Sequence, residues 1–167
     1  MTRVLTCAVG LLCALLASCA QDEASTQFNE KIMEGSRRLV EVGSGFGSAL
    51  RPFLEGGRGN AATLRLAHAT MAAELKLLEL EMRDFEVPER PGAREYLEEY
   101  GRFLGLQQEF LSGPYGEIMQ IVDGPEPPST ETVARVGVII DQAASREEVH
   151  LEALRKAQAR FVAGDTP

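Results

Sequence analysis

Four long stretches of the chain carry apolar residues spaced alternately four and three positions apart, over residues 26–54, 60–85, 93–122 and 129–162. This spacing lines apolar side chains along one side of a helix, which must then be buried against neighbouring helices. No run of alternating polar and apolar residues is long enough to predict a sheet. Since short turns join the stretches, the sequence predicts an all-α, antiparallel, up-down-up-down four-helix bundle.

Each predicted helix has its own set of core positions. The first comprises Phe28, Ile32, Gly35, Leu39, Val42, Phe46, Ala49 and Phe53. The second comprises Leu64, His68, Met71, Leu75, Leu78, Met82 and Phe85. The third comprises Leu97, Tyr100, Leu104, Leu111, Tyr115, Ile118 and Val122. The fourth comprises Val133, Val136, Ile140, Ala143, Glu147, His150, Leu154, Ala157 and Phe161.

Glycine, proline and capping residues predict where these helices begin, bend and end. Turns rich in Gly or Pro follow the first three helices at residues 56–59, 87–92 and 123–128. Asn60, and either Ser129 or Thr130, are suited to cap the helices that follow. The sequence Ser112-Gly113-Pro114 should kink or split the third helix, because proline cannot donate a backbone hydrogen bond.

Two helices carry features beyond a simple core stripe. Gly43 and Gly47 in the first predict either a bend or the close approach of another helix. Leu66, Leu77 and Leu80 widen the apolar face of the second helix. The second helix should therefore be the most buried of the four, or carry a surface for self-association as a homodimer.

The N-terminus has the character of an export signal. Arg3 precedes an uncharged run from Val4 to Ser18, which would make only about 22 Å of helix, against a hydrocarbon core of roughly 30 Å. The run closes on Leu16-Ala17-Ser18-Cys19, which resembles the lipobox of bacterial lipoproteins. The resemblance implies cleavage before Cys19 and a lipid on its thiol. It divides the chain into a signal peptide (1–18), lipidated Cys19 with a short tether (19–25), the bundle (26–162) and a disordered tail (163–167).

The residues after Cys19 bear on location. Among lipoproteins of this kind an Asp directly after the Cys favours the inner membrane, and here Ala20 stands in that place. The resemblance therefore implies an outer-membrane protein facing the periplasm. Six tether residues reach at most about 20 Å, so the bundle should lie close to the bilayer.

Composition limits how the mature chain can bind other molecules. Loss of the leader removes Arg3, so 16 basic residues face 25 acidic ones and the formal net charge becomes −9. This argues against nucleic acid and against electrostatic attachment to anionic lipid. The acyl chains on Cys19 should provide the anchor. Cys7 and Cys13 leave with the leader, so the bundle should contain no internal disulfide.

The two histidines and Glu147 are the candidates for a metal or ligand site. Glu147 and His150 have the Glu-x-x-His spacing that ferritin-like di-iron bundles use, but Arg65 stands three before His68, where a second such pair would need a glutamate. Met33 with His150 has roughly the axial-ligand layout of a bundle cytochrome. We expect core histidines, and no cofactor besides the lipid on Cys19.

No arrangement of Ser, His and acidic residues predicts catalysis. The sequence instead favours a lipid-anchored module, not an enzyme, that binds or scaffolds another envelope protein. The alternatives are a carrier of a ligand or metal at His68, Glu147 or His150, and a holdase-like periplasmic chaperone.

Overall fold

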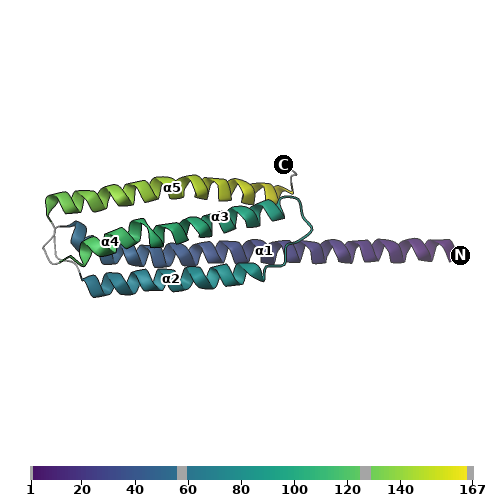
Figure 1. Ribbon diagram of the computed structural model, residues 1–167. Coiled ribbons are helices and arrows are strands. Elements are labelled where there is room, and N and C mark those ends of the chain that lie inside the picture. Colours follow the sequence, from purple (N-terminus) through teal and green to yellow (C-terminus); the bar gives the residue numbers. More distant parts are fainter. Residues whose placement is uncertain (1, 56–59, 125–128, 165–167) are drawn as a thin grey trace.

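The chain forms a bundle of helices in the computed structural model, which describes the backbone of residues 2–55, 60–124 and 129–164 and the side chains from residue 23 onward within these ranges. The elements are α1 (Thr2–Leu54), α2 (Ala61–Arg83), α3 (Ala93–Ser112), α4 (Pro114–Val122) and α5 (Thr130–Ala163) (Figure 1). Every regular element of the described residues is a helix, as the apolar spacing predicts. The predicted turn at 56–59, part of the connector at 123–128, and residues 165–167 of the predicted tail lie outside the described residues.

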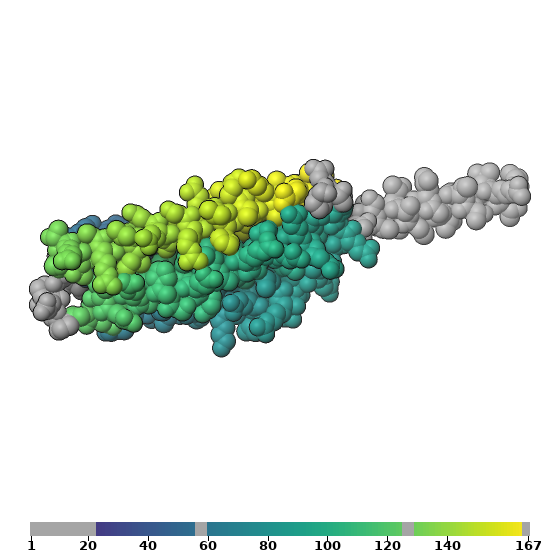
Figure 2. Space-filling model, turned by 45° about the horizontal axis from the view of Figure 1, so that its top comes forward, coloured from purple at the N-terminus to yellow at the C-terminus, as the bar shows by residue number. Residues whose placement is uncertain are grey.

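Neighbouring helices run in opposite directions. Along α1 and α2, Arg38 pairs with Glu74, whereas Phe46, further along α1, contacts His68, earlier on α2. The same reversal holds for α3 and α5, where Glu95 bonds to Arg160 and Glu109 to Arg146. Figure 2 shows α5 lying along α3 and α4. α3 and α4 together form the third arm of the four-helix bundle.

The predicted helix boundaries mostly match the structure. The side chain of Asn60 accepts a hydrogen bond from the Thr63 backbone N–H (3.1 Å) and caps α2. Ser129 does the same for α5, from Thr132 N–H (3.1 Å). The third helix is split at Gly113-Pro114, as predicted. Ala163 and Gly164, which we assigned to the tail, instead complete and cap α5, with Gly164 in the left-handed conformation (φ 74°) that glycine adopts without strain.

The first helix begins much earlier than the predicted Thr26. α1 is continuous from Thr2, so the backbone of the expected leader and tether is helical, and Ser25 is already buried. No glycine or proline lies between Gly10 and Gly35, so nothing in the chain interrupts the backbone hydrogen bonds there. The division of the chain at Cys19 stays a prediction.

The core follows the predicted stripes, but its most buried helix is α3, not α2. Nine residues of α3 are buried against four of α2. α3 is the more buried because its long aromatic side chains extend across the bundle. Tyr96 contacts the Phe28 ring of α1, and the Tyr100 hydroxyl lies against Gly35 of α1. Burial raises the pKa of Tyr96 to about 12 and raises that of Tyr100 further.

For Gly43 and Gly47 we predicted either a bend or the close approach of another helix, and close approach occurs at a different glycine. At Gly43 and Gly47 a Cβ atom would meet nothing within 4 Å, so these residues do not serve helix contact. At Gly35 it would collide with the Tyr100 hydroxyl and lie 3.1 Å from Cδ2 of Leu78. Gly35 therefore makes room for the side chain that α3 inserts between α1 and α2.

Candidate binding surface

An ion network joins α1 to α2 at the middle of their shared face. Nε of Arg38 donates to Oε1 of Glu74 (2.6 Å), and its Nη1 donates to both carboxylate oxygens of Glu81 (2.9 and 3.2 Å). The Arg38 side chain is only 25% exposed. The hydrogen bonds with Glu81 and then Glu74 raise the pKa of the Arg38 guanidinium, although burial acts in the opposite direction. Sequence reasoning missed this network because its members are 36 and 43 residues apart.

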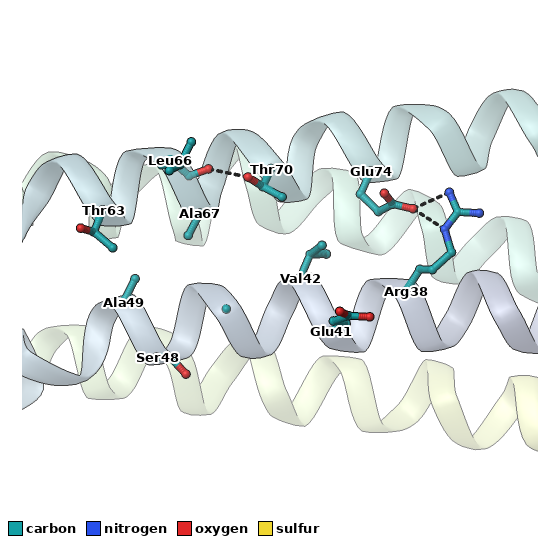
Figure 3. A pocket seen from close by; sticks show the side chains of 11 residues that line it. Arg38, Glu41, Val42, Ser48, Ala49, Thr63, Leu66, Ala67, Thr70 and Glu74 are labelled. Carbon is teal, nitrogen blue, oxygen red and sulfur yellow. Dashed lines mark hydrogen bonds and ion pairs between the residues drawn. The ribbon is translucent and has the colours of Figure 1, made fainter.

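A hollow lies on each side of this network, along the α1–α2 face. The first, of about 690 Å³, extends from Arg38 toward the start of α2 (Figure 3). Val42 and Ala49 of α1 point across it toward Thr63 and Ala67 of α2. The second, also about 690 Å³, extends from Arg38 in the other direction and has the Phe85 ring in its lining. The α1–α2 face is thus grooved along most of its length.

Small residues on both helices make the first hollow. Gly45 and Ser48 line its α1 side and Thr70 lines its α2 side. A Cβ added at Gly45 would meet no atom within 4 Å. Gly45 therefore leaves the surface concave at this point of α1 and does not bring a neighbouring helix closer.

The outer side of α2 borders this hollow and is apolar. Leu66 is 69% exposed, and Leu77 and Leu80 are also exposed. Of these three leucines, Leu66 lines the first hollow. The sequence predicted the widened face, and its use for self-association stays a prediction.

The candidate metal and ligand residues lie on two helices, and two of them, His68 and Glu147, have hydrogen-bond partners in the protein. Nε2 of His68 is 3.1 Å from the Leu111 carbonyl oxygen. The carboxylate of Glu147 accepts a hydrogen bond from the buried amide of Gln107 (2.7 Å). His150 is half-buried on α5, three residues after Glu147. In the part of the chain that the structure describes, no three His, Cys, Asp or Glu side chains are placed to hold a metal ion.

Two further residues bear on the sequence-based candidates. Met33 is exposed on α1, so it does not offer a buried axial ligand opposite His150. Gln107 is a buried polar residue that we missed, although its place between Leu104 and Leu111 continues the four-three spacing of α3. The side chain of Cys19, the predicted lipidation site, lies outside the described residues.

Replacing Arg38 by methionine should destabilise the bundle by about 1–3 kcal/mol, because Glu74 and Glu81, two turns apart on α2, would both lose this cation. Arg37 provides a matched control, since it is 62% exposed and its partners among the described residues are Glu34 and Glu41 on its own helix. Arg37→Met should change stability by less than about 0.5 kcal/mol. Urea unfolding followed by circular dichroism measures both variants, and equal effects would mean that the Arg38 network contributes nothing beyond a surface ion pair.

Comparisons with known proteins leave the chain without an assigned family. No family model matches it, no curated protein matches it, and no solved structure matches it. Among the helices as far as they are described, none combines the length and apolar character needed to cross a membrane.

Proposed function

We propose that this chain is a lipid-anchored protein of the bacterial envelope, whose bundle is a non-catalytic binding or scaffolding module. The observation that carries the proposal is Leu16-Ala17-Ser18-Cys19 at the end of an uncharged run preceded by Arg3. A leucine and two small residues give a leader peptidase access to the bond before the cysteine. The thiol is the nucleophile that accepts the lipid.

The shape of the bundle surface supports binding over catalysis. The two hollows on the α1–α2 face are open grooves, lined mainly by side chains of these two antiparallel helices. A helix of a partner protein fits such a groove, whereas small-molecule sites enclose most of their ligand. Arg38 is held between two carboxylates at the centre of the groove, where it can fix the register of a bound helix.

An anchor on Cys19 would also orient the bundle. The end that contains Phe28, Phe85 and Phe161 is the end from which α1 leads back toward Cys19 (Figure 1). Phe46 and His68 lie near the opposite end. The α1–α2 groove would then extend away from the membrane, and the end at which α1 stops and α2 begins would face the periplasm.

Replacing Cys19 by serine should abolish membrane attachment, because an acidic domain has no electrostatic affinity for anionic lipid to take the anchor's place. The measurement is fractionation of cell envelopes, with extraction by carbonate and by detergent. Cys13→Ser, within the expected leader, is the matched control and should leave the protein in the membrane fraction. A Cys19→Ser protein that still needs detergent for release would contradict the proposal.

A further inference from the structure

The exposed side of α2 repeats with the period of a coiled coil. Leu66, Ala73 and Leu80 follow each other at intervals of seven, and Thr63, Thr70 and Leu77 form a second series three positions earlier. All six are exposed on the described surface. In coiled-coil terms Thr63, Thr70 and Leu77 occupy a positions and Leu66, Ala73 and Leu80 occupy d positions. α2 therefore has a second seam on its outer side, made of three leucines, one alanine and two threonines, in addition to the one buried in the core.

Charged residues flank this outer seam with opposite signs on its two sides. Glu74 and Glu81 occupy e positions, next to the α1–α2 groove. Lys76 and Arg83 occupy g positions on the other side, and both are exposed. In a parallel pair of helices the g residues of one face the e residues of the other, so that opposite charges meet. In an antiparallel pair g faces g and e faces e, so that like charges meet.

We propose that the outer seam of α2 binds a second copy of this chain in a parallel, two-fold arrangement. Lys76 of one copy then lies five positions before Glu81 of the other, which is the spacing of a g–e pair. Arg83 lies one heptad after Lys76. In the proposed pair it would lie near the second hollow of the other copy. That hollow is lined by four acidic residues, Glu30, Glu34, Glu81 and Asp84, and by only two basic ones, Lys31 and Arg38. The two-fold axis doubles each of these contacts.

The parallel arrangement rests on the proposed function, because two chains anchored in one bilayer leave it in the same direction. The seam from Thr63 to Leu80 is about 26 Å long, so the pair buries less than the roughly 800 Å² per partner of a standard interface. Confinement to a membrane raises the local concentration and removes part of the orientational cost. The pair should therefore form on membranes far more readily than in dilute solution.

Disulfide crosslinking at single introduced cysteines tests the pairing and its direction. The variants are Leu66→Cys and Leu80→Cys, at the two ends of the seam, in the full chain expressed in bacteria and oxidised in isolated membranes. Val149→Cys on α5 is the matched control, because Val149 is also 69% exposed and apolar. The unsubstituted chain reports any background from its own cysteines. The parallel pair predicts dimers of both seam variants, several-fold above the Val149→Cys and unsubstituted chains.

Co-expression of differently tagged Leu66→Cys and Leu80→Cys chains separates parallel from antiparallel pairing. The two positions are 14 residues apart, or about 21 Å along a helix, which is beyond disulfide reach in a parallel pair. A dominant mixed product would overturn the parallel arrangement. If neither the single seam variants nor the mixed pair formed more dimer than Val149→Cys, self-association at this face would be overturned altogether.

Charge reversal distinguishes specific pairing from crosslinks formed by random collisions between chains in the membrane. Lys76→Glu, added to Leu80→Cys, should lower the dimer fraction roughly fivefold, because both symmetric g–e pairs become repulsive. Lys156→Glu on α5 is the control and should leave the dimer fraction unchanged, and a Lys76→Glu chain that dimerises equally well would contradict the proposal. Detergent extraction of the same samples measures separately whether the chain is anchored in the membrane. An anchored chain without seam dimers refutes only the pairing, and seam dimers of an unanchored chain refute only the anchor.

Discussion

Replacing Phe28 by alanine is expected to destabilise the bundle by about 3–5 kcal/mol, the range for removal of a buried aromatic ring. Phe28 contacts three other rings edge-on, with centroids 6.3 Å from Phe85, 6.0 Å from Tyr96 and 5.5 Å from Phe161. These rings belong to the segment after α2, to α3 and to α5. A single side chain of α1 therefore contacts α3, α5 and the segment that follows α2.

Urea unfolding measured by circular dichroism gives the free energy difference. A loss of 3–5 kcal/mol is a large part of the 5–15 kcal/mol that a domain of this size usually has, so partial unfolding at growth temperature is also expected. Val40→Ala is the control on the same helix, because Val40 is exposed, and it should change stability by less than about 0.5 kcal/mol. A Phe28→Ala protein as stable as Val40→Ala would show that the ring contacts of Phe28 with Phe85, Tyr96 and Phe161 are not central to the stability of the core.

Substituting alanine at two glycines of α1 should have effects of opposite sign. Gly47→Ala should stabilise the protein by up to about 1 kcal/mol, because alanine is the better helix former and its Cβ meets no atom within 4 Å. Gly35→Ala should destabilise it by about 1–3 kcal/mol, because the new Cβ would take the place of the Tyr100 hydroxyl. Unfolding in urea again measures the difference.

Tyr100→Phe tests the cause of the Gly35 effect. Among the described residues, the Tyr100 hydroxyl is buried without a hydrogen-bond partner, so its removal alone should cost little or stabilise the fold. In the double variant with Gly35→Ala, the new Cβ no longer meets the hydroxyl. The double variant should therefore lose less unfolding free energy than the sum of the losses of the two single variants. Strict additivity would mean that the Gly35 position is constrained by something other than this hydroxyl.

Residue spacing, together with glycine, proline and capping residues, was enough to predict the helices from residue 26 onward, their inner faces and their breaks, but not the start of α1 at Thr2. The positions from Phe28 to Phe53 on α1 and from Val136 to Phe161 on α5 are buried or half-buried as the four-three pattern requires. Asn60, Ser129 and Pro114 act locally on the backbone, so their effects could be inferred from a few neighbouring residues. These predictions depend only on contacts within one helix or its ends.

The remaining features depend on which helices become neighbours, and this the spacing does not give. Gly35, rather than Gly43 or Gly47, makes room for another helix only because Tyr100 of α3 lies opposite it. Arg38 is half-buried only because α2 places Glu74 and Glu81 beside it. The groove beside them follows from the same pairing of α1 with α2, so it could not be located from either helix alone.

The most direct test of the account is the intact mass of the protein extracted with detergent from membranes of cells that express the full chain. The account predicts a chain that begins at Cys19, lacks residues 1–18 and carries the additional mass of a diacylglycerol thioether with its acyl groups. After proteolysis, an N-terminal peptide that contains Cys19 and carries this additional mass would locate the lipid. An unmodified chain that retains Met1–Ser18, or one cleaved at another residue with a free Cys19 thiol, would contradict it.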